Sequence, residues 1–167
     1  MAIVSTIHLE IPEIPGESEV DGYDKLPQID CKSWSWGASA TTNMQISTGG
    51  TATGANVQDI RITKSMDGSS ANLMWFCSKG TQMPKITLHL CKGGGADGKQ
   101  WDWCTIVMEN CIIAGVTMGG SGDDPGQETV TINFSKYNMK YFKQADDDGV
   151  QKAGADNSYD IRAGKQV

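Results

Sequence analysis

The sequence predicts a mainly β fold: an antiparallel β-barrel or sandwich of about eight strands, with one short α-helix inserted midway and one long extended loop. Apolar and polar residues alternate in several segments, as they do in half-buried strands. The 20 glycines lie among serine- and threonine-rich turns. Connections between the predicted strands are short, which favours antiparallel pairing. At 167 residues the chain is long enough to bury the core of one domain.

The first predicted strand is residues 3–11, I-V-S-T-I-H-L-E-I, where isoleucine and leucine alternate with polar residues. A turn-rich segment, P-E-I-P-G-E-S-E-V-D-G, follows it. Residues 26–36 form a second extended run that ends in S-W-S-W-G. Residues 57–64, V-Q-D-I-R-I-T-K, alternate again and predict a further strand.

Between the last two strands, residues 37–56 carry no charged side chain. A loop of this length inside a compact domain is usually functional or mobile. Its middle contains Met44 and Ile46, so part of it could pair as a strand. Without charge, this loop makes a poor solvated linker and a plausible adhesive arm.

A short helix is predicted from S-S-A-N-L-M-W-F-C-S-K-G. Ser69 or Ser70 can act as its N-cap, and Gly80 can end it after Lys79. Apolar residues at positions 73, 76 and 77 would share one face of this helix.

The second half of the chain predicts more strands. K-I-T-L-H-L-C-K starts after Pro84, G-G-G-A-D-G-K closes a hairpin, and W-D-W-C-T-I-V-M-E-N and C-I-I-A-G-V-T-M follow. After the loop G-G-S-G-D-D-P-G, residues 128–143 form a long strand run that we expect to bend near Ser135. We assign residues 1–143 to the β domain and residues 144–167 to a polar C-terminal tail, expected to be irregular and partly ordered by a partner.

Charge argues against several functions. The formal net charge is −6 and the sequence pI is about 4.8, so general nucleic-acid binding is not expected. No apolar run reaches the roughly 20 residues that span a bilayer, so no membrane partner is expected. The first residues alternate and lack the basic and apolar regions of a cleaved signal peptide.

No catalytic, cofactor or metal site is predicted. None of the five cysteines forms a C-x-x-C pair, and only two histidines are present, His8 and His89. Both histidines fall on the polar faces of strands and are interpreted as structural or exposed. The match to G-x-G-x-x-G at residues 93–98 precedes a strand, whereas a dinucleotide site needs a helix there. The run Asp146 to Asp148 lacks the alternate spacing of a calcium loop and is interpreted as solvated.

Two tryptophan pairs leave alternatives open. Trp34 with Trp36, and Trp101 with Trp103, lie two residues apart, so each pair would point to one face of a strand. Such a face could belong to the core or a subunit interface, or it could stack on a sugar. A carbohydrate-binding β-sandwich module therefore stays as the alternative function. A small hydrolase has little support from the residue inventory.

Several of these stretches, taken in order over residues 3–143, resemble the Hcp family, the haemolysin-coregulated tube proteins of bacterial type VI secretion. They are I-P-G-E-S, S-W-S-W-G with the long loop after it, V-Q-D-I-R-I-T-K, the serine-started helix, and M-G-G-S-G-D-D-P-G-Q-E-T-V-T-I-N-F-S-K-Y-N-M-K-Y. The last stretch is similar to the family's glycine-rich loop followed by E-x-V-x-L-x-F-x-K. The hairpin near W-D-W is richer in Trp and Cys than the family pattern, and the tail does not match it.

The resemblance implies a non-enzymatic structural subunit that forms hexameric rings. These rings stack into a tube, which is assembled in the cytoplasm and then secreted, with a lumen that can carry effectors. Its implied partners are further copies, the spike and sheath components, and effectors. Residues expected to stack rings are Gly37, Thr42, Met44, Ile46, Gly49 and Gly50. Residues expected within the ring interface are Val57, Asp59, Arg61, Thr131, Asn133 and Tyr141, and Trp34 and Trp36 are expected to brace the root of the loop.

Overall fold

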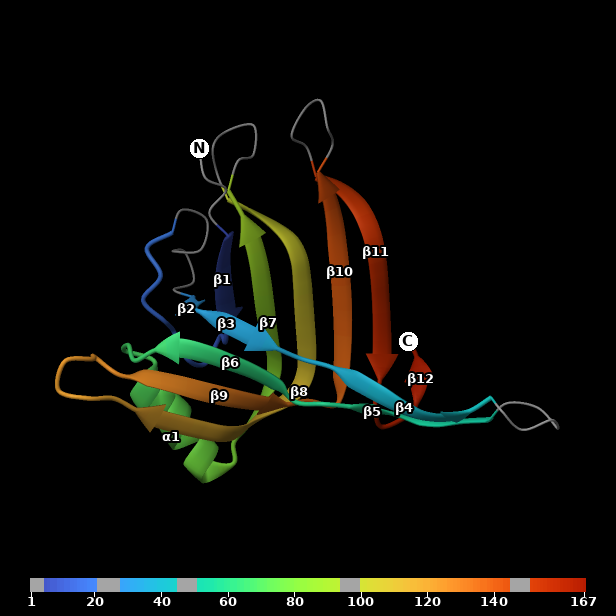
Figure 1. Cartoon of the computed structure of the whole chain (residues 1–167), viewed down its shortest axis with the longest axis horizontal. Coiled ribbons are helices and arrows are strands. Elements are labelled where there is room, and N and C mark those ends of the chain that lie inside the picture. The colour runs from blue at the N-terminus through green and yellow to red at the C-terminus, as the bar shows by residue number, and fades with distance from the viewer. Residues whose placement is uncertain (1–4, 21–27, 45–50, 94–99, 145–150) are drawn as a thin grey trace.

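The computed structural model describes residues 5–20, 28–44, 51–93, 100–144 and 151–167, and it shows two β layers with a projecting hairpin (Figure 1). The strands are β1 (Ser5–Glu10), β2 (Ile29–Cys31), β3 (Ser33–Ser35), β4 (Ala38–Asn43), β5 (Thr51–Val57), β6 (Ile60–Ser65), β7 (Gln82–Lys92), β8 (Trp101–Gly119), β9 (Gln127–Asn133), β10 (Lys136–Gln144), β11 (Gln151–Asp160) and β12 (Lys165–Gln166). The helix of the described part is α1 (Ser70–Lys79). The mainly β class, the antiparallel pairing and the short helix midway are confirmed.

A single long strand joins the two layers. The first half of β8 pairs with β7 and β10, and its second half pairs with β9. Between the halves, Asn110 has a positive φ of 52°, a conformation that asparagine tolerates better than most residues. The two strands expected at 101–110 and 111–118 are therefore one bent strand.

The strand order is β12-β11-β10-β8-β7-β1-β2 in one layer, and β8 continues through β9 and β6 to β3 in the other. Over the described residues this pairing does not close into a barrel, so the fold is a sandwich. The described strands outnumber the expected eight for two reasons. The extended run expected at residues 26–36 contains two short strands, β2 and β3, and the loop and the tail both contain strands, the short β12 among them.

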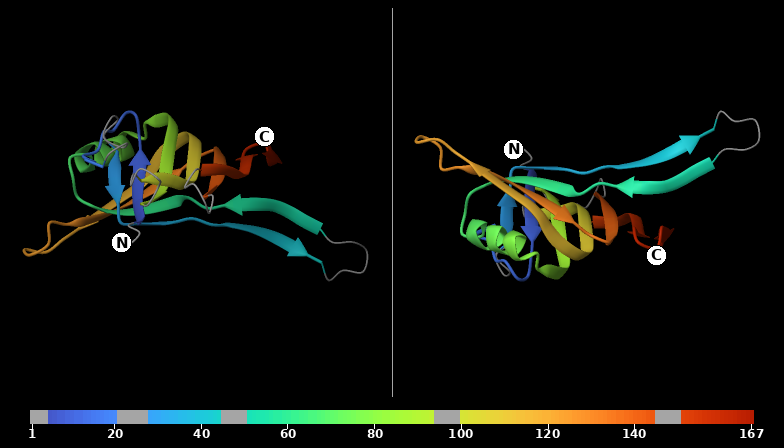
Figure 2. Two further views of the ribbon diagram at one scale, coloured as in Figure 1. Left: turned by 90° about the horizontal axis from the view of Figure 1, so that it is seen from above. Right: turned by 90° about the horizontal axis from the view of Figure 1, so that it is seen from below.

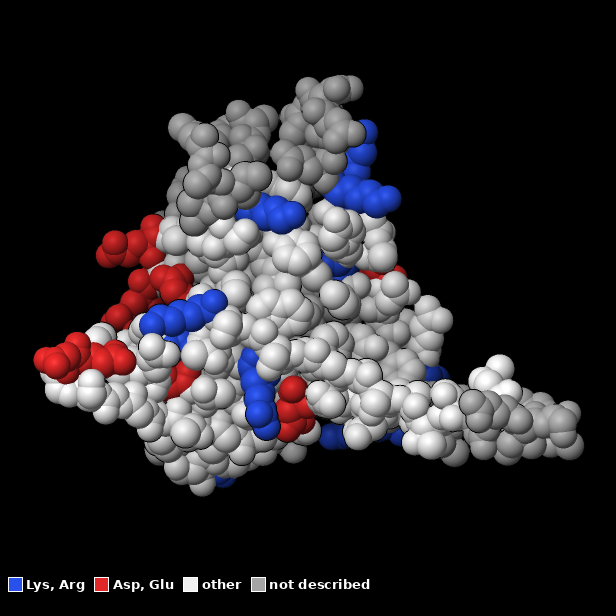
Figure 3. Space-filling view, viewed as in Figure 1, with Lys and Arg blue, Asp and Glu red and all other residues white. Residues whose placement is uncertain are grey.

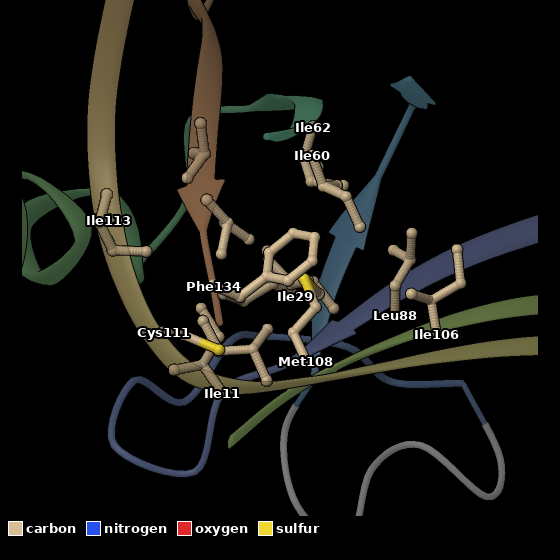
Figure 4. Packing of buried hydrophobic residues seen from close by; sticks show 14 of the residues in the cluster. Ile11, Ile29, Ile60, Ile62, Leu88, Ile106, Met108, Cys111, Ile113 and Phe134 are labelled. Carbon is tan, nitrogen blue, oxygen red and sulfur yellow. The ribbon is translucent and has the colours of Figure 1, made fainter. Parts of the chain in front are cut away.

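The core lies between the layers. Ile60 and Ile62 of β6 point toward Leu88 of β7 and Ile106 of β8, and all four side chains are fully buried (Figure 4). Fully burying an aliphatic side chain of this size contributes about 1.5–3 kcal/mol. The alternation that predicted these strands therefore reports which face packs inward.

Helix α1 packs against β8 and buries Leu73 completely. Gly80 ends the helix with a φ of 63°, as its sequence position predicts. Ser69 occupies the N-cap, but its side chain makes no capping hydrogen bond. Its hydroxyl donates to Asp67 instead.

The expectation of an irregular C-terminal tail is wrong for Gln151–Asp160. This segment forms β11 and pairs with β10 from Lys136 to Gln144, and β12 adds a short pairing. Its partner is β10 of the same chain, so no second protein is needed to order it. The backbone hydrogen bonds of the ladder stabilise a segment whose side chains carry little apolar signal.

Candidate assembly surfaces

The uncharged loop is largely a β-hairpin arm. Strands β4 and β5 pair with each other in a two-stranded sheet separate from the main one. The arm projects well beyond the sandwich (Figure 2), and its surface shows neither acidic nor basic side chains (Figure 3). Strands β4 and β5 thus give the arm a large reach, and its sequence carries no charge over residues 38–57.

The expected ring-stacking residues spread along this arm. Gly37 lies at its root, Thr42 is exposed on β4, and the Met44 side chain is 78% exposed. Ile46, Gly49 and Gly50 lie outside the described residues.

The two root tryptophans pack against their own core. Trp34 pairs across the sheet with Ile62, whose side chain is fully buried. Trp36 packs its ring edge-on against Tyr137 with centroids 4.8 Å apart, and its Nε1–H donates to the Gln58 carbonyl at 2.9 Å. Both indoles are therefore packed against their own chain at the root of the arm and do not form an open stacking platform.

Five of the six expected in-ring residues gather at one polar hollow. Arg61 of β6 pairs with Thr131 of β9, and Asn133 donates to Asp59 at 2.7 Å. Val57 lines the same hollow, as does Trp36. The sequence named these residues from separate segments, and the β6–β9 pairing brings them together.

Tyr141 lies elsewhere. It is on β10, 42% exposed, and it lines a separate apolar groove that Trp36 also lines. Its ring also contacts Trp103 with centroids 6.1 Å apart. The expected set of in-ring residues is therefore divided between two surfaces that share Trp36.

A buried ion pair was missed by the sequence reasoning. Lys64 Nζ donates to Glu128 Oε1, and both side chains are fully buried. Lys64 also donates to Asp67 Oδ1 at 2.9 Å, and the Ser70 hydroxyl donates to Glu128 Oε1 at 3.1 Å. The network ties β6 and β9 to the start of α1. The sequence contained a signal that Lys64 is buried, because Lys64 is in phase with the inward residues Ile60 and Ile62.

The two histidines are structural. His8 is 1% exposed, and its Nδ1 lies 2.9 Å from Asp30 Oδ1. Burial lowers the pKa of His8, although Asp30 opposes this shift. His89, its cross-strand partner, lies between Asp102 at 2.8 Å and Glu10 at 2.9 Å. Burial alone would lower the pKa of His89, but hydrogen bonds and charges from Asp102 and Glu10 outweigh it and raise the pKa.

Three of the five thiols are poorly suited to nucleophilic chemistry. Burial raises the pKa of Cys31 and of Cys111 to about 12, and it also raises the pKa of Cys104. A thiolate is the reactive form, so these shifts suppress reactivity. Within the described ranges, no group of three or more His, Cys, Asp or Glu side chains could hold a metal ion. The same ranges contain no helix long and apolar enough to cross a bilayer.

Fold and surfaces together define a two-layer β-sandwich with a projecting, uncharged β-hairpin. The family model described as type VI secretion system effector, Hcp, matches residues 8–141. The protein hcp1 of Pseudomonas aeruginosa is 33% identical over 95% of this chain and 96% of its own length. The chain therefore belongs to the Hcp family of type VI secretion proteins.

Solved structures agree with this assignment. A type six secretion system protein superposes with a TM-score of 0.83 at 20% identity, over 98% of this chain and all of the other, which supports the fold. Hcp1 from Salmonella typhimurium has a TM-score of 0.73 at 26% identity, over 98% of this chain and 99% of the other.

Proposed function

We propose that this protein is a non-enzymatic subunit of the type VI secretion tube. Its copies form hexameric rings that stack, are assembled in the cytoplasm and are then secreted. The lumen of the rings can carry effectors, and spike and sheath components are the other partners. The observation that supports this proposal most directly is the uncharged arm on an Hcp fold.

The arm favours an assembly role for energetic reasons. A two-stranded hairpin alone is marginally stable in water at best. The β4–β5 hairpin projects from the sandwich and lacks charged side chains that would favour solvation. Contact with a second copy would cover it, and copies of the same acidic chain avoid electrostatic repulsion where the contact surface is uncharged.

The two expected kinds of contact fit separate surfaces. A ring requires a heterologous interface, where one patch meets a different patch on the neighbour. We assign the polar hollow around Arg61 and Thr131 to contacts within the ring, since it lies on the main sandwich. We assign the arm, with Thr42 and Met44, to contacts between rings, since it reaches beyond the sandwich.

The absence of enzymatic activity is part of the proposal and is supported by the side chains. The thiols named above have raised pKa values, and His89 is held by two carboxylates of its own chain. The alternative of a carbohydrate-binding module has less support, because Trp34 faces the core and the Trp36 ring is packed edge-on against Tyr137.

Removing residues 42–53 tests the arm. Thr41 and Gly54 would then close the Ala40–Ala55 pair as a two-residue loop, a length that hairpins commonly use. We expect hexameric rings by native mass spectrometry but no stacked tubes by negative-stain microscopy. A pair of point substitutions gives a matched comparison. Thr42→Asp places a charge in the arm, and the control Ser121→Asp places the same charge in the exposed β8–β9 loop. Normal tubes without residues 42–53 would refute the arm assignment, and a purely monomeric wild-type protein would refute the proposed function.

A further inference from the structure

An apolar groove lies between the root of the arm and strands β10 and β11. It has a volume of about 410 Å³ and is lined by Trp36, Tyr137, Met139, Tyr141, Ala155 and Asn157, with the start of the arm at one edge. The described side chains that line it carry no charge. A groove of this size can hold a few side chains, since small-ligand pockets span about 300–1,000 Å³.

The groove exists because the inward face of β10 extends past the second layer. Tyr137, Met139 and Tyr141 alternate along β10 with polar residues, and they lie on the face of the core residues of β8. Beside the core, this face is covered by β6 and β9. Farther out it is exposed, so Met139 is 37% and Tyr141 is 42% exposed.

The opposite face of the same two strands is charged and internally paired. Lys140 lies 3.4 Å from Asp156, and Lys136 lies 3.6 Å from Asp160. The two faces of β10 and β11 therefore differ sharply. Only the charged face suits permanent contact with water.

The arm carries a matching apolar side chain at a different place on the molecule. Met44 is the most exposed large hydrophobic side chain in the described part of the chain, and a methionine fits irregular apolar surfaces well. Met44 cannot reach the groove of its own chain. Gly37 and Ala38 form the groove's edge, and the six residues of β4 carry the chain about 20 Å away from it, at about 3.3 Å a residue.

We propose that this groove receives the Met44 end of the arm from a copy of the chain in the next ring. This inference rests on the proposed function and names the surface that the arm binds. An exposed apolar side chain and an exposed apolar groove at different sites form a heterologous contact, which builds an open polymer where its rotation does not close into a ring. Neither surface carries a charge that would have to be desolvated.

Substitutions on both sides of the contact test the proposal. Met44→Asp and Ala155→Asp should each leave hexameric rings intact by native mass spectrometry. Each should weaken ring stacking at least about tenfold, measured as the concentration at half-association in sedimentation. Ala155 is exposed on β11, so this change tests the groove without disturbing the core. Met74→Asp is the matched control, because Met74 is 38% exposed on α1, and it should stack like the wild type.

Charge exchange tests direct contact. Met44→Lys combined with Ala155→Asp should recover part of the stacking that Ala155→Asp alone loses. Normal stacking of Ala155→Asp rings, with stacking lost in Met44→Asp, would overturn the groove assignment and leave the proposed function intact. Loss of the rings themselves in Ala155→Asp would place the groove within the ring and also overturn the inference. Oligosaccharides that quench tryptophan fluorescence, with quenching lost in Ala155→Asp, would identify a sugar as the occupant and overturn it as well.

Discussion

Replacing Glu128 by glutamine should destabilise the fold far more than an ordinary surface change. The substitution keeps the side chain's shape and removes its charge, which leaves the buried Lys64 ammonium without its main partner. Breaking a buried pair costs about 3–5 kcal/mol. Asp67 still contacts Lys64 at 2.9 Å, so we expect the lower end of this range, about 3 kcal/mol.

This free energy corresponds to a large change in melting temperature. For a domain of this size, each kcal/mol shifts the melting temperature by about 2–4 °C, so Glu128→Gln should lower it by about 6–12 °C. The assay is thermal and urea unfolding at one protein concentration, with the assembly state of each variant checked by native mass. Glu109→Gln is the matched control, because Glu109 is exposed on β8 and the change should cost under about 0.5 kcal/mol.

A second variant separates charge from packing. Replacing both members of the pair, Lys64→Met with Glu128→Leu, should be neutral or stabilising relative to the wild type, because neither buried charge is left unpaired. If Glu128→Gln melts no lower than Glu109→Gln, the reasoning about an uncompensated buried charge is refuted.

Two further predictions concern pH and backbone conformation. Because the pKa of His89 is raised above its ordinary 6.5, the contribution of His89 to stability should be fully present below pH 6.5 and be lost as the pH rises through the folded-state pKa. Unfolding midpoints measured from pH 6 upward should therefore fall more steeply with pH in the wild type than in His89→Gln. Equal slopes in the two proteins would contradict this prediction. Gly80→Ala should lower the unfolding free energy by about 1–2 kcal/mol, because Gly80 has a φ of 63°. In the control Gly54→Ala, where an added Cβ meets nothing within 4 Å, urea unfolding should change little, and an equal loss in both variants would exclude a conformational cause.

Much of the fold could be predicted because its strands alternate strongly. Ile60, Ile62 and Lys64 share one phase, and the same phase that identified the strand also placed the lysine inside. β11 could not be predicted this way. The residues of β11 that line the groove, Ala155 and Asn157, are exposed and are small or polar. The segment is ordered by its backbone pairing with β10, which is not visible in the local sequence.

The candidate surfaces were predictable in part for a related reason. Arg61 and Thr131 are brought together by the β6–β9 pairing, and both belong to strands that the alternation predicts. Tyr141 lies on a different surface from these two residues, because its position depends on the bend in β8 at Asn110. That bend directs the two halves of one strand into different layers, and it decides which of the other strands share a face.

Trp36 is the residue at which these surfaces meet. Its ring lines both the polar hollow around Arg61 and the apolar groove beside Tyr137. Its indole N–H is already satisfied by the Gln58 carbonyl, next to the root of the arm, so its position is fixed within the chain. If the hollow serves contacts within a ring and the groove serves contacts between rings, one rigid side chain forms a wall of both. Because Trp36 is held in place by its own chain, the hollow and the groove keep a fixed position relative to each other.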